Sequence, residues 1–344
     1  MTNLKPLRWG LISTARINQA VIGPIQSSKI SQLTAVASRN LDKAEDYAKT
    51  NNIPRFFGNY DSLINDPDID VIYNSLPNSL HAEWSIKAMK MGKHVLCEKP
   101  LSTSIAEVDK IIEVARQTGM VITEAFMYRH HPQTLLIKKM VDDGEIGRIQ
   151  LIRGSFCYTN TRQNNPRFDL DLGGGSLWDV GCYPIGYARY LTGEEPVEVF
   201  GYQVTGPTGI DLIFAGQLHF PNEVFVQIEC SFITPYKTLI EITGDEGRII
   251  ISEPYKPGLK TKIYLERNRP ARKITIKGAE LYRGEIEDLE NAILSGSPPR
   301  ISLKDSRANI AAIEALYQSA RSSKPVTIPK QYNVNAEREN DISK

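Results

Sequence analysis

A lysine, an aspartate and a tyrosine in this sequence have the residue types needed to move protons at a substrate oxygen. Lys99 stands in Cys97-Glu98-Lys99-Pro100, directly after an apolar run. An ammonium group there can donate a hydrogen bond to a carbonyl oxygen and stabilise a developing alkoxide. Asp179 and Tyr183 lie four residues apart after Gly173-Gly174-Gly175, so in a helix they share one face. A tyrosine next to a lysine can serve as acid or base, because the ammonium favours the phenolate.

Each of these residues also has a purely structural interpretation. A Lys-Pro pair is typical of a surface turn, and the spacing Ser176-x-x-Asp179 is that of a capping box at the start of a helix. Tyr183 could belong to the core. On the functional interpretation, we expect Asp179 to hold the lysine in place and to orient the substrate.

A turn near the N-terminus has the position of a dinucleotide-binding turn. The first apolar run leads into Ser13-Thr14-Ala15-Arg16-Ile17. Dinucleotide-binding folds have small residues there, so that the backbone approaches the pyrophosphate at the N-terminus of a helix. Ser13 and Ala15 stand where glycines are usual, so an ordinary strand-to-helix turn is the alternative.

Basic residues at the end of the second apolar run favour NADP(H) as the cofactor. NAD-binding folds usually have an acidic residue there for the ribose hydroxyls, whereas this sequence has Ser38-Arg39 and then Lys43. A guanidinium is always charged and presents forked donors, which suits the ribose 2′-phosphate of NADP. The alternatives are NAD(H), or two solvated surface charges that bind no cofactor.

Alternating strand and helix patterns position these residues in the first part of the chain. Apolar runs predict strands at 7–13, 33–38, 70–75, 94–97 and 121–126. Helical patterns lie at 42–49, 80–91 and 104–118, the last with Ser104 and Glu107 as a capping box and Gly119 at its end. This alternation predicts an α/β Rossmann domain, a doubly wound parallel sheet with its ligands at the carboxyl ends of the strands.

A mostly β pattern replaces this alternation after about residue 127. A helix at 132–142 precedes predicted strands at 149–158, 197–204, 212–220, 224–233, 238–242, 248–252, 261–266 and 273–276. Short breaks such as Pro221-Asn222 predict hairpins, and therefore an α+β domain with a large, mostly antiparallel open sheet. Helices at 279–294 and 303–322, the second capped by Ser302, follow. We predict a dinucleotide-binding Rossmann domain over 1–127, a substrate-binding and oligomerisation domain over 128–330, and a polar C-terminal tail over 331–344.

The composition narrows the range of partners. The 41 basic and 40 acidic residues leave a net charge of +1, which gives no argument for nucleic acid or an anionic membrane. No apolar run approaches the roughly 18 residues of a membrane span, and the polar N-terminus lacks the apolar core of a signal peptide. Four scattered cysteines fit reduced thiols in the cytoplasm. The five histidines are not spaced as metal ligands with nearby acids, so we expect no metal.

The motifs occur in a characteristic order along the chain: the dinucleotide turn, Pro77-Asn78-x-x-His81, Glu98-Lys99-Pro100, and a triple-glycine helix with an acid and a tyrosine. Over nearly the whole chain, this order resembles the glucose–fructose oxidoreductase, inositol dehydrogenase and MocA (Gfo/Idh/MocA) family of NAD(P)-dependent oxidoreductases. The resemblance implies a Rossmann domain followed by a domain with a large open sheet. It also implies that Lys99 is catalytic and that Asp179 and Tyr183 complete the site.

Further roles follow from the same resemblance. The expected cofactor-binding residues are Ser13, Thr14, Ala15, Arg16, Ile17, Ser38, Arg39, Lys43, Leu76, Pro77, Asn78, His81, Glu98 and Lys99. The expected substrate-binding residues are Lys99, Arg129, Arg167, Asp179 and Tyr183. Surface salt bridges are the alternative for the two arginines. A structural role is the alternative for His81, and structural roles are expected for His130 and His131.

Two departures from the family pattern refine the expected activity. Ser13 and Ala15 replace common glycines, and Tyr183 stands where the inositol dehydrogenase branch has histidine. Both features resemble the branch with NADP-dependent xylose and glucose dehydrogenases and dimeric dihydrodiol dehydrogenase. That branch implies hydride transfer between nicotinamide and a CH–OH or carbonyl carbon of a sugar or sugar-like molecule. A trans-dihydrodiol dehydrogenase and a non-catalytic NADP-binding sensor on the same fold are the alternatives.

The resemblance also implies an assembly. Along one predicted strand, Val224, Val226 and Ile228 share one face, and Phe225, Gln227 and Glu229 share the other. The first set suits burial under helices, and the second suits an interface or a wet surface. Because family members usually pack this sheet against its symmetry mate, we expect a homodimer or tetramer formed through the second-domain sheet.

Overall fold

The chain forms two compact units, and each contains one of the two predicted sheets. The computed structural model describes residues 5–162, 165–267 and 270–329, so the tail predicted over 331–344 lies outside the described residues. One unit consists of Met1–His130 with Glu280–Ser306, and the other of His131–Ala279 with Arg307–Lys344. Within the described ranges, no helix has both the length and the apolar character needed to cross a bilayer.

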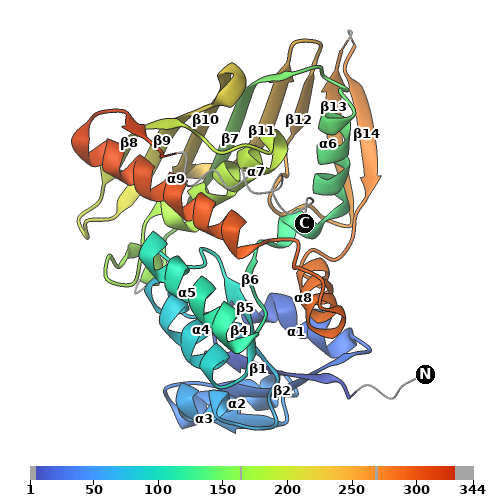
Figure 1. Ribbon diagram of the computed structural model, residues 1–344, viewed down its shortest axis with the longest axis vertical. Coiled ribbons are helices and arrows are strands. Elements are labelled where there is room, and N and C mark those ends of the chain that lie inside the picture. Colours follow the sequence, from blue (N-terminus) through green and yellow to red (C-terminus); the bar gives the residue numbers. More distant parts are fainter. Residues whose placement is uncertain (1–4, 163–164, 268–269, 330–344) are drawn as a thin grey trace, which may run out of the picture. The chain divides into compact units, whose positions relative to one another are not determined.

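The first unit confirms the predicted doubly wound fold. Its six strands lie in the order β3-β2-β1-β4-β5-β6, and all neighbouring pairs are parallel (Figure 1). The strands are β1 (Leu7–Ile12), β2 (Ser31–Ala37), β3 (Arg55–Phe57), β4 (Val71–Asn74), β5 (His94–Glu98) and β6 (Ile122–Ala125). The helices are α1 (Asn18–Ser27), α2 (Leu41–Thr50), α3 (Tyr60–Ile64), α4 (His81–Lys90), α5 (Ile105–Thr118) and α8 (Arg283–Ser295).

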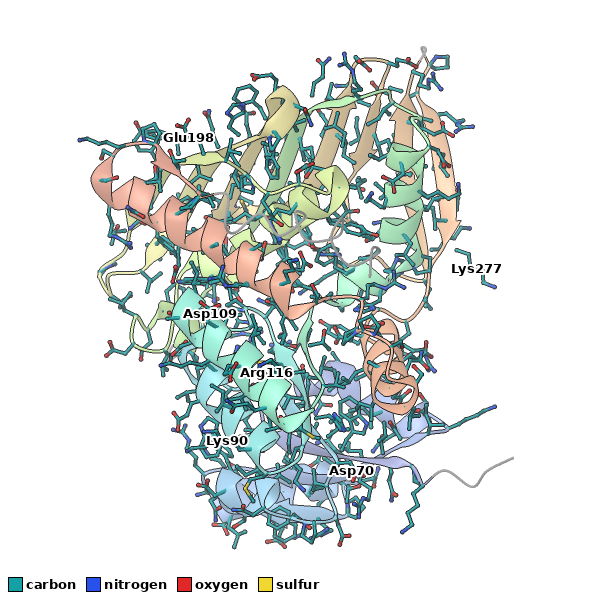
Figure 2. The ribbon with its side chains drawn as sticks, in the orientation of Figure 1. Asp70, Lys90, Asp109, Arg116, Glu198 and Lys277 are labelled. Carbon is teal, nitrogen blue, oxygen red and sulfur yellow. The ribbon has the colours of Figure 1, made fainter. Side chains whose placement is uncertain are left out.

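Helices cover this parallel sheet on both faces, which is why its strands are almost continuously apolar. Figure 1 shows α1 and α8 on one side of the sheet and α4 and α5 on the other. Helix α5 buries Val108 and Ile111, while Asp109 and Arg116 lie on its exposed side (Figure 2). The carboxyl ends of β1, β2, β4 and β5 therefore stay available to carry the predicted site.

Local details of this unit differ from the prediction in two ways. β3 and α3 were not predicted, because three- and five-residue elements are too short to show a period. The predicted capping box of α5 is also wrong, since the Ser104 side chain makes no capping bond. Instead Ser102 Oγ donates to Glu107 Oε2 at 2.5 Å and accepts from the Ser104 amide at 3.1 Å.

The second unit contains a nine-stranded sheet in the order β14-β13-β12-β11-β7-β10-β9-β8-β15. Its strands are β7 (Ile149–Thr159), β8 (Glu198–Thr205), β9 (Asp211–Phe220), β10 (Val224–Ser231), β11 (Ile233–Gly244), β12 (Arg248–Ile251), β13 (Lys260–Glu266), β14 (Arg272–Lys277) and β15 (Val326–Thr327). All neighbours are antiparallel except β7 and β10, which confirms the mostly antiparallel prediction. Helices α6 (Pro132–Asp142) and α7 (Cys182–Thr192) pack on this sheet, and α9 (Leu303–Ser322) begins with the predicted Ser302 cap.

The division into units differs from the predicted boundaries at two segments. The prediction assigned all of 128–330 to one domain, whereas residues 128–130 and Glu280–Ser306 belong to the first unit. Ile286 and Leu289 of α8 are buried in the same core as Trp9, Val21 and Ile25. The apolar stripe of α8 is readable from the sequence, but a stripe does not say which of the two sheets it covers.

Candidate active site

The predicted dinucleotide turn follows β1, and its first residue is a serine with backbone angles that are typical of glycine. Ser13 has φ of 83°, in the left-handed region that favours glycine. Its Oγ lies 3.0 Å from Ser75 Oγ and accepts from the Ala15 amide at 3.1 Å, and its carbonyl accepts from Asn18 Nδ2 at 2.9 Å. Thr14 to Ile17 then lead into α1, whose N-terminus carries a positive partial charge. This cradle fits the pyrophosphate of a dinucleotide, and Asn18, which supports it, was not predicted.

The end of β2 presents the predicted basic pair to solvent. Ser38 is buried, and its Oγ accepts from the Asn40 amide at 3.3 Å, whereas Arg39 and Lys43 are exposed. Asn40 caps α2 by accepting from the Lys43 amide at 2.9 Å. Tyr60, in the unpredicted helix α3, lies close enough for the charge of Arg39 to oppose the rise that burial causes in the Tyr60 pKa.

His81 connects the two loops that follow β4 and β5. Its imidazole is buried, with Nδ1 2.7 Å from the Pro100 carbonyl and Nε2 2.7 Å from the Leu76 carbonyl. Burial lowers the pKa of His81 to about 4, while the hydrogen bonds to the two carbonyl oxygens oppose that shift. These contacts favour the structural role over a cofactor contact for His81. Pro77 and Asn78 precede it at the same edge of the sheet, where η1 (Asn78–Leu80) begins.

Glu98 and Lys99 lie at the carboxyl end of β5, the edge where the fold predicts ligands. Glu98 Oε1 accepts from the Tyr73 hydroxyl at 2.5 Å, and Oε2 accepts from the Lys99 amide at 3.3 Å. Burial and the nearby Glu98 raise the pKa of Tyr73, so its hydroxyl stays protonated and donates. Burial and Glu98 also raise the pKa of Glu285 from α8. Sequence reasoning missed both Tyr73, which bonds to Glu98, and Glu285, whose pKa the charge of Glu98 helps to raise.

Asp179 lies in a π-helical turn, η4 (Leu177–Gly181), which continues into α7. Its Oδ2 accepts from Arg167 Nε at 2.8 Å and from the Tyr158 hydroxyl at 3.0 Å. Burial and the charge of Asp179 raise the pKa of Tyr158. The capping-box interpretation of Ser176 and Asp179 is therefore wrong, because the Asp179 carboxylate is taken up by other side chains. Tyr158 was not predicted, since it stands in a strand with nothing in its local sequence to mark it.

Tyr183 stands one turn later and is buried. Its ring centroid lies 5.4 Å from that of Phe156 and 5.5 Å from that of Tyr255. Phe156 and Tyr158 are alternate residues of β7 and so face the same side of the sheet. Asp179 and Tyr183 therefore both meet this one face of β7, as the predicted shared helical face requires.

The two arginines proposed for the substrate have different surroundings. Arg167 is half-exposed and pairs with Asp179. Arg129 is buried and forms an ion pair with Asp305, at 2.9 Å between Nη1 and Oδ2, which favours the salt-bridge alternative for this residue. His131 accepts from the Gln133 amide at 3.1 Å and caps α6, a structural role.

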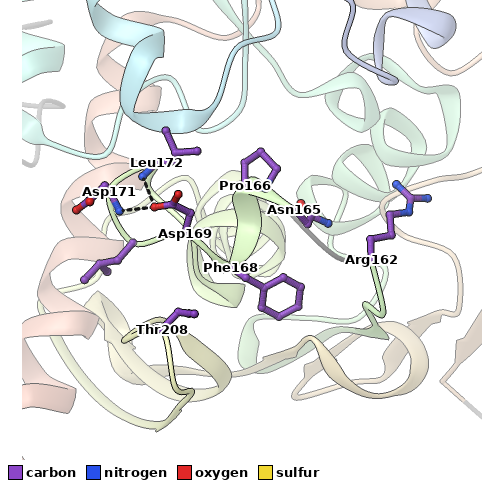
Figure 3. A pocket seen from close by; sticks show the side chains of 9 residues that line it. Arg162, Asn165, Pro166, Phe168, Asp169, Asp171, Leu172 and Thr208 are labelled. Carbon is purple, nitrogen blue, oxygen red and sulfur yellow. Dashed lines mark hydrogen bonds between the residues drawn. The ribbon is translucent and has the colours of Figure 1, made fainter.

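An open cleft of about 880 Å³ adjoins the segment that precedes the π turn (Figure 3). Its lining consists of Arg162, Asn165, Pro166, Phe168, Asp169, Leu170, Asp171, Leu172 and Thr208. The Asp169 and Arg167 carbonyls accept from the amides of Gly174 and Gly175 at 2.8 and 3.0 Å. A Cβ on Gly174 would lie 2.5 Å from the Arg167 carbonyl oxygen, so glycine is needed for the cleft wall to approach this closely. The described residues include no group of three or more side chains suited to a metal ion.

Comparison with known proteins identifies the family. The family model described as "Oxidoreductase family, NAD-binding Rossmann fold" matches residues 7–126, and that of the "GFO/IDH/MocA C-terminal domain" matches residues 134–250. The chain belongs to the Gfo/Idh/MocA family. It is therefore an oxidoreductase, as the resemblance implied.

Relatives within this family include enzymes with named reactions. A D-xylose 1-dehydrogenase (NADP⁺) from Haloferax volcanii is 31% identical over 94% of this chain and 100% of its own. A trans-1,2-dihydrobenzene-1,2-diol dehydrogenase from Xenopus tropicalis is 30% identical over 90% of this chain and 97% of its own. A 3-ketoreductase from Actinomadura kijaniata, solved in complex with NADP and TDP-benzene, has a TM-score of 0.88 and 29% identity, and covers 92% of this chain and 98% of its own.

One lysine and one tyrosine of the Actinomadura reductase have been substituted in solved structures. Its structure has also been solved with one tyrosine replaced by phenylalanine and with one lysine replaced by alanine or glutamate. The number of residues between that lysine and that tyrosine equals the number between Lys99 and Tyr183 in this chain.

Proposed function

We propose that this oxidoreductase uses NADP(H) to transfer a hydride between the nicotinamide ring and a CH–OH or carbonyl carbon of a sugar or sugar-like substrate. The observation that carries the proposal is the combination of Lys99 at the carboxyl end of β5 with Tyr183 after the π turn. These two residue types recur at the same separation as the lysine and tyrosine substituted in the Actinomadura reductase. The NADP in that structure and in the name of the xylose dehydrogenase supports the choice of cofactor.

The cofactor fits the residues of the first unit. The Ser13 cradle and the N-terminus of α1 would hold the pyrophosphate, and Arg39 with Lys43 would hold the ribose 2′-phosphate. Leu76, Pro77, Asn78 and Glu98 stand at the same carboxyl edge and would line the nicotinamide half. When bound, the cofactor supplies or accepts the hydride. The protein's own groups must therefore supply the proton and stabilise the charge on the reacting oxygen.

Lys99 and Tyr183 are the residues proposed for that task. The Lys99 ammonium would donate a hydrogen bond to the reacting oxygen and stabilise negative charge that develops there. The Tyr183 hydroxyl would give the proton in reduction and take it in oxidation. Asp179 already accepts from Arg167 and Tyr158, and we propose that it also orients the substrate and holds the lysine in place.

The cleft beside the π turn is proposed to take the part of the substrate away from the reacting carbon. Its wall combines charged and amide side chains with the ring of Phe168, which suits a molecule that has both hydroxyl groups and an apolar face. Phe168 contacts Phe232 at 5.5 Å between ring centroids, and Phe232 contacts Tyr158 at 5.4 Å. Packing thus connects the cleft with the Asp179 cluster.

A substrate panel tests the proposal. We expect reduction of NADP⁺ or oxidation of NADPH with at least one member of a set of aldoses, dihydrodiols and deoxy-ketosugars. Turnover confined to dihydrodiols would favour the dihydrodiol dehydrogenase alternative, for which the Xenopus relative is the specific support. Tight NADPH binding without turnover of any compound would favour the sensor alternative.

We further propose a homodimer or tetramer formed through the outer face of the nine-stranded sheet. The strand register brings exposed aromatic side chains from three strands, Tyr202, Phe225 and Tyr264, to the same face of the sheet. Val226 and Ile228 are buried on the other face. Exposed aromatic side chains among polar ones on one sheet face suit self-association. The four cysteines are free thiols, which supports a cytoplasmic location.

A further inference from the structure

The π turn that carries Asp179 begins without a cap from its own segment. Ser176 occupies the N-cap position with helical backbone angles, and its side chain makes no capping bond to the turn. The acceptor is Asp211, the first residue of β9. Asp211 Oδ2 accepts from Ser176 Oγ at 2.6 Å and from the Leu177 amide at 2.8 Å. A carboxylate from a distant strand thus provides the cap, and the helix dipole favours a negative charge at that position.

A third donor and a glycine complete the arrangement around Asp211. The Tyr317 hydroxyl of α9 donates to Asp211 Oδ1 at 2.6 Å. Gly175 has φ of 126°, and a Cβ there would lie 2.3 Å from Asp211 Oδ1 and 2.7 Å from the Tyr317 oxygen. The last glycine of the triple-glycine segment is therefore the residue that lets Asp211 and Tyr317 reach the start of the turn.

Burial restricts the cluster of Asp211, Ser176 and Tyr317 to one geometry. Asp211 is 2% exposed, and burial raises its pKa while the hydrogen bonds from Ser176, Tyr317 and Leu177 oppose that shift. Buried polar groups whose hydrogen bonds are satisfied fix one geometry, because any displacement leaves an unpaired group in a low dielectric. The cluster therefore holds the first residues of the turn in a single orientation.

We propose that Asp211 is a positioning residue, which fixes the π turn through Ser176 and Leu177 so that Asp179 and Tyr183 are aimed at the substrate. The inference rests on the proposed function, in which those two residues act on the substrate. Displacements of about 1 Å at reacting groups can lower turnover by up to about 100-fold. Asp211 touches neither the reacting atoms nor the cofactor in this scheme, so its effect reaches the chemistry only through the turn.

The test compares two substitutions at one position. Asp211→Ala removes the acceptor, and we expect kcat to fall about 10- to 100-fold while the Kd for NADPH changes little. Asp211→Asn keeps one oxygen for Ser176 and Leu177, and its amide can donate to the Tyr317 hydroxyl, so we expect kcat within about threefold of wild type. Tyr317→Phe is the matched control, because it removes one donor to Asp211 and leaves the cap in place.

Hydrogen–deuterium exchange over 175–183 supplies a readout that does not depend on activity. We expect faster exchange there in Asp211→Ala and wild-type exchange in Asp211→Asn. An unchanged kcat per folded molecule in Asp211→Ala, or unchanged exchange in the turn, would overturn the positioning role. If Asp211→Ala does not fold, Ser176→Ala removes one of the two links to the turn and should lower kcat about threefold with a detectable rise in exchange. A wild-type protein without turnover would instead contradict the proposed function, while exchange would still test the cap.

Discussion

Removal of the Arg39 side chain should separate NADP(H) from NAD(H) binding. Arg39 stands two residues after the end of β2, at the carboxyl edge of the sheet. A hydrogen bond to a charged group contributes about 1.5–3 kcal/mol, and solvent exposure of Arg39 moves the expected value to the lower end of that range. We therefore expect Arg39→Ala to weaken NADPH binding at least about tenfold. NADH lacks the 2′-phosphate, so its affinity should change little.

Calorimetric titration of both cofactors provides the measurement. Arg116→Ala is the matched control, because Arg116 is an exposed arginine of the same unit that pairs with Glu113. Its affinity for both cofactors should equal that of wild type. Equal weakening of NADPH and NADH by Arg39→Ala would refute the assignment of the 2′-phosphate to Arg39.

Three further predictions concern catalysis, pH and assembly. Tyr183→Phe keeps the packing ring and removes the hydroxyl, so turnover should fall about 10²- to 10⁴-fold with little change in Tm; a lower Tm with normal turnover per folded molecule would favour a core role. Burial and Glu98 raise the pKa of Glu285. The folded state therefore retains a proton that the unfolded chain releases above about pH 4.3. Because the folded state binds more protons, the free energy of unfolding falls as the pH rises above that value. Glu285→Gln should remove this dependence and raise Tm at about pH 8, and a lower Tm there would mean that an ionised Glu285 is needed. Light scattering at micromolar concentration should give a multiple of 38.6 kDa that Phe225→Glu reduces, whereas 38.6 kDa for wild type would contradict the assembly.

Much of the fold follows from local patterns in the sequence. The amphipathic period and caps predict α6 and α9 with the same bounds that the structure has, and the hairpin break at Pro221-Asn222 predicts the antiparallel pairing of β9 and β10. What failed depends on distant residues. The spacing of Ser176 and Asp179 predicts a local capping box, but Asp211 provides the cap from 35 residues away. Likewise, nothing local shows that α8 returns to the first sheet.

In the candidate site, too, local sequence predicts some residues, while others depend on contacts with distant parts of the chain. Glu98 and Asp179 could be singled out because a strand end and a glycine-rich turn mark them. Their partners Tyr73 and Tyr158 stand inside ordinary strands, and only the packed structure brings their hydroxyls to the predicted residues. A tyrosine that buries its ring and donates its hydroxyl has no sequence signature of its own.

Transfer of deuterium from C4-labelled NADPH to a carbonyl substrate tests the central claim most directly. Two samples of NADPH would be used, with deuterium at C4 in one or the other configuration. The protein would be incubated with each sample and with the compound that the substrate panel selects. The product would then be analysed by mass spectrometry. We predict one deuterium on the former carbonyl carbon, and loss of this transfer in Lys99→Ala while the variant still binds NADPH. No label in any product, despite NADPH binding by the wild-type protein, would contradict the claim that the protein transfers a hydride.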